Sequence, residues 1–309
     1  CYAESEDGIN WYKPNLGLVE DEGSDQNNII MGLKCPGSGF SAFLDSNPNS
    51  IPEQRIKGNA HGVWQKGNDY AHLYGFSTPD ATNWIQIKDE PLIKGSLPNH
   101  WDAQNSIFWS EAEQQYVIYA RYMVGPDGLL GENFRKVDEK SRIRSTAKAT
   151  SPDFENWSEF TSMEYSDTDS ITPSAQLYTN QTTPYFRANQ IYISLPGRIF
   201  FKKIKNPKIV KDEVDFGDCS DGVLMTTRAG SNRYDFTFRE SLLRPGIGDE
   251  NWTTRNNYPA CGVIQTGETE MSIFVQRHYS QTSAYLERMT LRLDGFASLN
   301  AGYDEGQII

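Results

Sequence analysis

The chain has 309 residues and a formal net charge of −12 at pH 7, and 37% of its residues are hydrophobic. This apolar fraction is sufficient for a packed core, which excludes disorder of the whole chain. No apolar run approaches the length of about 18 residues that a membrane-spanning helix needs. The first ten residues have neither the basic nor the apolar segment of a signal peptide. So acidic a chain is a poor candidate for nucleic-acid binding, which depends on clustered Lys and Arg.

Short alternating or apolar runs, which are typical of β-strands, follow one another along the chain. They comprise 27–33, 39–45, 70–76, 106–110, 115–123, 142–150, 190–195, 198–204, 222–228, 261–265, 271–279 and 284–293. Helical periodicity over ten or more residues is hard to find between them. The sequence therefore predicts an all-β protein.

A repeated turn motif divides these runs. In each of three copies an Asp stands four residues before a Trp, and the pairs are Asp7/Trp11, Asp80/Trp84 and Asp153/Trp157. Successive Trp residues are 73 positions apart, and a degenerate fourth copy covers 226–234. An Asp side chain that accepts hydrogen bonds from nearby backbone N–H groups sets a tight turn. We therefore expect these Asp residues to be structural rather than catalytic.

The spacing of strands and turns predicts the architecture. Four short strands in about 70 residues are typical of one blade of a β-propeller. We predict a single domain over 1–309, a five-bladed β-propeller whose first blade is incomplete at the N-terminus of the chain. The blades are expected at about 1–15 (partial), 27–88, 104–163, 184–240 and 260–298.

Candidate catalytic residues lie where the innermost strands are expected to begin, because those ends meet at the central cavity. Asp25 precedes the second blade and Asp102 precedes the third, so the two carboxylates come from neighbouring blades. Glycoside hydrolysis needs two carboxylates that flank the scissile bond. Glu240 follows the fourth turn; it could form an ion pair with an Arg, or it could reach the cavity as the reserve acid. Each Asp could instead cap a strand or bond to a neighbouring turn.

Further polar and aromatic residues stand at the same expected strand starts. The candidates for substrate binding are His100, Trp101, Gln104, Asn105, Tyr185, Arg187, Arg255, Asn257 and Tyr258. Amides and carboxylates suit sugar hydroxyls, and aromatic rings suit the apolar face of a sugar. Arg187 and Arg255 each require an anion, supplied either by a protein carboxylate or by the substrate. If they are unpaired, we expect a uronate or a sulfated sugar as the substrate.

The sequence offers no cofactor motif. The four His residues lack metal-ligand spacing, and the four Cys residues form no CxxC pair, so we predict no metal site in catalysis. Acidic loops leave a structural calcium ion open, although nothing matches an EF-hand. We therefore expect no cofactor, and the cysteines could be free or paired in disulfides.

Several segments, taken together, resemble a known group of proteins. They are 1–17, 177–180, 184–188, 243–246, 256–260 and 291–296. This set is similar to bacterial secreted proteins that are glycoside-hydrolase-like five-bladed propellers, related to glycoside hydrolase families 32 and 43. The resemblance covers nearly the whole chain. It implies a glycosidase fold, a carbohydrate substrate, and a secreted, periplasmic or cell-surface location.

The resemblance also implies where a mechanism would reside. In families 32 and 43 three carboxylates act from the inner strands of the first three blades: a base or nucleophile, a supporting Asp and an acid Glu. Asp25 and Asp102 occupy the corresponding places on the second and third blades of this chain. No Glu begins the third blade, so the acid of the family is not carried over. A carbohydrate-binding propeller without catalysis is the main alternative, and a protein-interaction propeller is a weaker one.

Overall fold

The computed structural model is all-β, as the sequence predicts. It describes residues 1–31, 39–62, 72–95, 101, 103–125, 128–129, 137–138, 141–201, 218–253, 255–279 and 281–298. Two 3₁₀ turns, η1 (Pro52–Gln54) and η4 (Asp249–Asn251), are the named helical elements of these residues. No helix in this part of the chain is long and apolar enough to cross a membrane.

Two large antiparallel sheets come first in the chain. The β1 sheet has the order β1 (Ser41–Leu44), β2 (Ile56–His61), β3 (Leu73–Thr78) and β4 (Ile85–Gln86). The β5 sheet has the order β5 (Ser106–Ser110), β6 (Gln115–Gly125), β8 (Ile143–Ser151) and β9 (Thr161–Ser162), with β7 (Gly128–Leu129) beside β6. The strands β5 and β6 coincide with predicted runs rich in β-branched and aromatic residues, which fit a pleated and buried surface. The strand β2, with the sequence IKGNAH, has no such run and was not predicted.

The third assembly, here the β12 sheet, is interrupted along its strands. One part has the order β11 (Gln176–Leu177), β14 (Gly197–Phe200), β15 (Cys219–Gly222), and the other β12 (Thr183–Tyr185), β13 (Ala188–Ser194), β16 (Met225–Arg228). The break falls at Pro196, which has no N–H to donate to a ladder. Its carbonyl instead accepts the Val223 N–H at 3.1 Å, so the two parts continue each other. The short strands β10 (Glu164–Tyr165) and β17 (Arg233–Tyr234) pair in parallel beside them.

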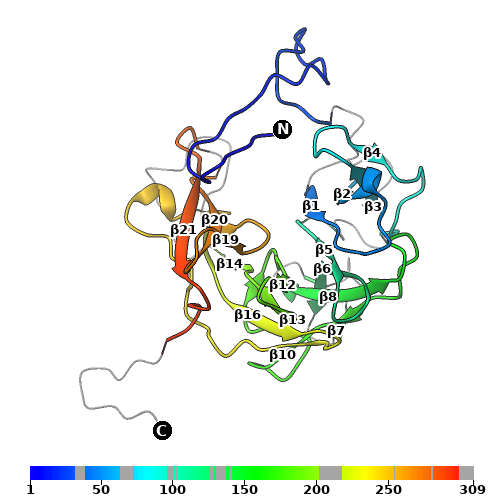
Figure 1. The fold of residues 1–309 in the computed structure, drawn as a ribbon. Helices are drawn as coiled ribbons and strands as arrows, with labels where there is room; N and C mark the ends of the chain where they lie inside the picture. Colours follow the sequence, from blue (N-terminus) through cyan, green and yellow to red (C-terminus); the bar gives the residue numbers. More distant parts are fainter. Residues whose placement is uncertain are drawn as a thin grey trace.

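The last assembly, the β20 sheet, has the order β18 (Tyr258–Pro259), β20 (Glu270–Arg277) and β19 (Ile264–Gln265), with β21 (Tyr285–Arg292) also paired to β20. In Figure 1 the four assemblies follow one another in chain order around a common centre, from β1 at the right to β21 at the left. This arrangement is that of propeller blades.

The N-terminal segment stands between the two ends of this arc (Figure 1). Within 1–31 it forms the isolated bridges Glu4–Tyr12 and Asp21–Ser24 and no named strand. Trp11 meets Phe274 of β20 edge-on, with ring centroids 6.0 Å apart. The described residues thus contain four blade-like assemblies, and the count of five blades stays a prediction. Residues 27–31 form no strand, so the inner strand expected at the start of the second blade is β1 instead.

The hydrophobic core lies between the sheets, in three clusters. One joins the β1 and β5 sheets, one joins the β5 and β12 sheets, and one joins the β12 and β20 sheets. All five residues of β5 are buried, because both faces of a blade pack against neighbours. The largest fully buried side chains of the clusters include Trp101, Tyr119, Phe154, Tyr165, Tyr192, Tyr234 and Phe236.

Two buried charge pairs fasten neighbouring sheets together. Glu113, just beyond β5, pairs with Lys148 of the same sheet at 3.0 Å and accepts the hydroxyl of Tyr192 from the β12 sheet at 2.7 Å. Asp45, just beyond β1, pairs with Lys57 and accepts the hydroxyl of Tyr116 from the β5 sheet at 2.8 Å. The carboxylate, lysine and tyrosine therefore recur at two successive sheet junctions. We call each set a junction clamp.

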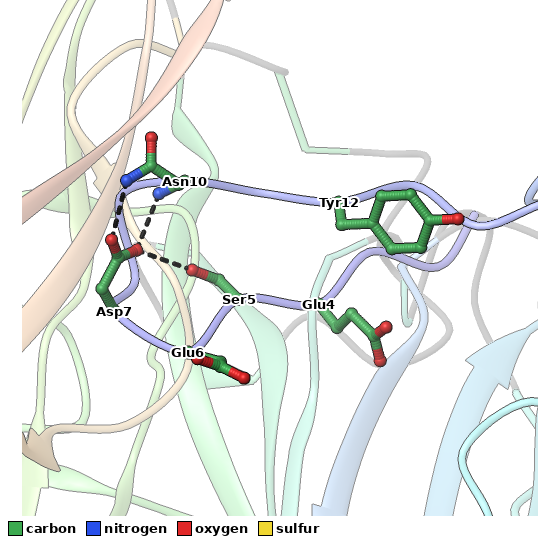
Figure 2. A pocket seen from close by; sticks show the side chains of 6 residues that line it. All are labelled: Glu4, Ser5, Glu6, Asp7, Asn10 and Tyr12. Carbon is green, nitrogen blue, oxygen red and sulfur yellow. Dashed lines mark hydrogen bonds between the residues drawn. The ribbon is translucent and has the colours of Figure 1, made fainter.

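The repeated Asp residues form tight turns. Figure 2 shows Asp7 directed at Asn10 and Ser5, and its carboxylate accepts the backbone N–H of Asn10 at 2.7 Å. Asp80 and Asp153 accept the equivalent backbone N–H groups at 2.8 Å each. A hollow of about 570 Å³ opens beside the Asp7 turn, but the carboxylate of Asp7 is already engaged by hydrogen bonds within the turn. The structural assignment of these Asp residues is confirmed.

Candidate functional site

Aromatic and arginine side chains gather where the first strands of the β12 and β20 sheets begin. The guanidinium of Arg144, from β8, lies 5.6 Å from the ring centroid of Tyr178, and that of Arg255 lies 6.0 Å from the same ring. Tyr178 stacks on Tyr258 with centroids 5.5 Å apart. Arg255 also lies 5.5 Å from the ring of Tyr279 and donates to its hydroxyl at 3.1 Å. We call these five residues the arginine–tyrosine cluster.

Within the described part of the chain, no carboxylate neutralises the positive charge of the cluster. Arg144 donates to the side-chain oxygen of Gln176 at 3.3 Å, and among the described residues neither Arg144 nor Arg255 has an acidic partner. Burial raises the pKa of Tyr258, and the neighbouring Tyr178 raises it further, while the two arginines act in the opposite direction. The two guanidiniums therefore act on the same phenol.

A glycine makes the tyrosine stack possible. Gly197, at the start of β14, faces the ring of Tyr258, and a Cβ atom at this position would lie 2.4 Å from the ring carbon Cδ1. Any larger residue would push the ring away, because real Cβ contacts are not that short. The position of Tyr258 over Tyr178 thus depends on the absence of a side chain at residue 197.

The predicted carboxylates are not part of this cluster in the described residues. Asp25 is exposed in the segment that precedes β1, where its side chain accepts the amide of Gln26 at 3.0 Å. Its expected place at the start of an inner strand is wrong, since β1 begins at Ser41. Glu240 is exposed in the loop after β17 and makes no hydrogen bond with a described residue. Asp102 and His100 lie outside the described residues.

Three of the predicted substrate-binding residues are structural instead. Trp101 is 1% exposed and packs its ring on Phe160 at 4.8 Å. Asn105 is fully buried; its amide donates to the carbonyls of Trp101 and Ala103, and its oxygen accepts the N–H of Arg121. These side chains shape the turn before β5 and offer no group to a ligand.

Asn257 is the third. It is fully buried, and its amide donates to the carbonyls of Ser220 and Asn251 at 2.7 and 3.3 Å. Its oxygen accepts a guanidinium N–H of Arg277. Asn257 therefore fixes the start of β18 from within. Gln104 is partly exposed, and its side-chain oxygen accepts the side-chain amide of Gln181. Its side-chain N–H groups remain available at the strand start.

Tyr185 and Arg187 lie at the other end of their strand. Tyr185 is the last residue of β12, and Arg187 is in the turn that leads to β13. Both contact Asp294: Arg187 forms an exposed ion pair with it, and the hydroxyl of Tyr185 donates to it at 2.6 Å. Of the two anions considered for Arg187, the protein carboxylate of Asp294 is the one present. The expected place of Arg187 at the start of an inner strand is wrong, because the residue follows β12.

The sequence missed Arg144, Tyr178 and Tyr279. Tyr178 stands in the Leu-Tyr-Thr-Asn stretch that carries part of the family resemblance, which was a signal of its importance. Arg144 lies in the run 142–150, which was interpreted only as a strand. Its role depends on the approach of two sheets, which a local pattern does not reveal. In the part of the chain described, no group of three or more His, Cys, Asp or Glu could hold a metal ion.

Comparisons with known proteins identify the fold. Neither the models of known protein families nor the curated proteins gave a match. Among solved structures, an N-acetylgalactosamine deacetylase from F. plautii, in complex with blood group B trisaccharide, is similar at a TM-score of 0.60 and 11% identity, over 95% of this chain and 81% of that one. A structure described as a glycoside hydrolase is similar at a TM-score of 0.57 and 10% identity, over 99% and 80% of the two chains.

A third similar structure belongs to the GH130 family of mannoside phosphorylases, which contains glycoside hydrolases that target β-1,2 mannosidic linkages in Candida mannan. Its TM-score is 0.53 at 10% identity, over 97% of this chain and 76% of that one. At such identities the similarity establishes a shared fold and nothing more. The expected resemblance to glycoside-hydrolase-like propellers is confirmed at that level.

Proposed function

We propose that the chain is a glycoside hydrolase that acts on a poly- or oligosaccharide bearing carboxylate or sulfate groups. The arginine–tyrosine cluster would hold one such group. Two observations support the proposal: the fold is shared with carbohydrate-active proteins, and the cluster lies where first strands begin. A secreted, periplasmic or cell-surface location suits such a substrate.

The observation that carries the proposal is the pair of guanidiniums around Tyr178, neither of which has an acidic partner among the residues that the structure describes. A guanidinium in a structured environment binds carboxylate or sulfate oxygens through two parallel N–H groups. The aromatic rings beside it are apolar on their faces and polar at their hydroxyls. This combination suits an anionic sugar ring better than a neutral one.

Hydrolysis also needs a pair of carboxylates, one to donate a proton and one to act as base or nucleophile. We assign one of these roles to Asp102, which stands directly before Ala103 and the strand β5. Asp25 and Glu240 remain candidates for the second role. The reaction needs no cofactor, because carboxylates supply both proton transfers.

A carbohydrate-binding propeller without catalysis is the second candidate. The observation in its favour is that neither Asp25 nor Glu240 forms a hydrogen bond or an ion pair with the arginine–tyrosine cluster. On this alternative the cluster binds the same anionic sugars and no bond is cleaved.

The test is sugar release from neutral, uronate-containing and sulfated polysaccharides by the wild type, Asp102→Asn and Arg255→Gln. We expect release from an anionic member of the panel, loss of turnover in Asp102→Asn, and weaker binding in Arg255→Gln. Arg228→Gln, which removes a charge at the exposed end of β16, is the matched control. Retained binding without release from any substrate would favour the non-catalytic alternative. Release only from neutral substrates would contradict the role of the cluster.

A further inference from the structure

A hollow at the strands β14 and β15 is not used in the proposal above. It has a volume of about 500 Å³ and lies between β14, β15 and the loop 241–252. Its lining comprises Arg198, Phe200, Cys219, Asp221, Ser241, Arg244, Pro245, Gly246 and Trp252. We call it the β14–β15 groove. Sites for small molecules and single sugar rings typically have this size.

On one wall of the groove, the polar side chains already have hydrogen-bond partners within the protein. Arg198 donates to both carboxylate oxygens of Asp221, at 2.9 and 2.6 Å, and to the carbonyl of Arg239 at 2.8 Å. Its guanidinium also lies 4.9 Å from the ring centroid of Phe200. Ser241 donates to Asp221, which is only 4% exposed. This wall is rigid and has no spare charge.

Two other lining residues, Arg244 and Trp252, have groups that a ligand could contact. Trp252 is 39% exposed, and its indole N–H is fixed by a hydrogen bond to the carbonyl of Gly246 at 3.0 Å. The flat face of the indole therefore has a defined orientation without further ordering. The side chain of Arg244 is exposed and makes no hydrogen bond or ion pair with any described residue. An aromatic face and a guanidinium that pairs with no described residue thus line the same groove.

The groove and the cluster are connected through a single buried arginine. Arg277 donates to the carbonyl of Arg244 at 3.1 Å and to the side-chain oxygen of Asn257. Asn257 directly precedes Tyr258 of the cluster. Arg277 is 6% exposed, so this connection is part of the folded framework. The framework of the groove and that of the cluster are therefore joined through Arg277.

We propose that the β14–β15 groove is a second carbohydrate subsite, for a sugar ring that carries a carboxylate or a sulfate. The ring stacks on Trp252 and the anion pairs with Arg244. This inference rests on the proposed function and extends it, because a chain that fills both sites has to be a polymer with repeated negative charge. A protein partner would need about 1,000 Å² of complementary surface, far more than this groove supplies.

Calorimetric titration with defined oligosaccharides tests this subsite separately from the cluster. The probes are galacturonate oligomers of two and of ten units, κ-carrageenan oligomers of both lengths for the sulfate, and neutral galactan oligomers. The variants are Arg244→Gln and Trp252→Ala. Arg239→Gln removes the same charge from the same loop outside the groove lining and is the matched control.

We expect Arg244→Gln and Trp252→Ala to weaken the binding of the ten-unit anionic probe about tenfold, which is about 1.4 kcal/mol. The two-unit probe, whose binding the proposed function assigns to the cluster alone, keeps its affinity, and Arg239→Gln changes the affinity for neither probe. Unchanged two-unit binding also shows that the variants are folded. The probe that binds identifies the anion as carboxylate or sulfate.

Three results would overturn the subsite. Ten-unit binding that is unchanged in both variants but lost in Arg255→Gln would remove the groove and leave the proposed function standing. Equal weakening of two-unit and ten-unit probes would mean that the groove is not a separate site. Absence of binding of any anionic probe to the wild type would overturn the groove and the anionic substrate together.

Discussion

The junction clamp between the β5 and β12 sheets gives a quantitative prediction for Lys148→Met. Lys148 and Glu113 are paired at 3.0 Å, and their side chains are 6% and 8% exposed. Methionine retains most of the volume of the lysine stem but removes its charge. Glu113 then remains buried without its cation and keeps hydrogen bonds from the Tyr192 hydroxyl, the N–H of Gly230 and the side-chain amide of Gln115, the last at 3.4 Å.

The magnitude follows from this loss of one partner. Leaving a buried charge uncompensated costs about 3–5 kcal/mol, whereas losing an exposed pair costs about 0–1 kcal/mol. The three hydrogen bonds that persist place the expected loss at the lower end, about 3 kcal/mol. The second substitution Glu113→Gln removes the stranded charge and still accepts from Tyr192, so the double variant should regain part of the loss.

Urea unfolding at pH 7, followed by tryptophan fluorescence, measures both variants. We expect a lower midpoint for Lys148→Met and partial recovery for Lys148→Met/Glu113→Gln. The equivalent clamp at the preceding junction makes Lys57→Met a matched second case. A loss below about 1 kcal/mol for Lys148→Met would mean that the pair behaves as an exposed one. A double variant less stable than the single one would also refute the reasoning.

Three further predictions concern the turns and the site. Backbone and side-chain hydrogen bonds outweigh burial and lower the pKa of Asp153 to about 2, so its contribution to stability is present above about pH 4 and is lost as pH falls towards 2; Asp153→Asn should flatten that decline in urea unfolding at pH 5 and pH 3. Gly197→Ala should displace the ring of Tyr258 and weaken the binding of anionic oligosaccharides. An affinity equal to that of the wild type in calorimetry would contradict the role of the stack. Arg187→Gln should change stability by less than about 1 kcal/mol and leave binding intact, because its pair with Asp294 is exposed at 47% and 55%; a larger loss in urea unfolding would contradict this.

The strands and turns were largely predictable because their signals are local. The Asp turns recur with one spacing, and the run 106–110 coincides with β5. The start of the second blade was misplaced because 27–33 is apolar without forming a strand in its described part. The fourth blade was predicted to begin at 184, although its first strand, β11, begins at Gln176. Pro196 separates β13 from β14, so the β12 sheet is interrupted there.

The site was predictable only in part. Arg255 and Tyr258 were identified because polar residues before a strand are conspicuous in any propeller sequence. Asn105 and Asn257 have the same local appearance, yet their side chains complete buried backbone hydrogen bonds, which only the packed structure reveals. Arg144 contributes from the third strand of one sheet to the first strand of the next. Such a contact between sheets leaves no short-range pattern.

The most direct test of the central claim is the affinity of the arginine–tyrosine cluster for an anionic sugar. Calorimetry with the two-unit galacturonate and κ-carrageenan probes would compare the wild type, Arg144→Gln/Arg255→Gln and the control Arg228→Gln. We predict binding of one anionic probe that falls at least tenfold in the double variant, weakens with added salt and is unchanged in the control. Equal affinity of the double variant and the wild type, or equal affinity for neutral and anionic probes, would contradict the claim.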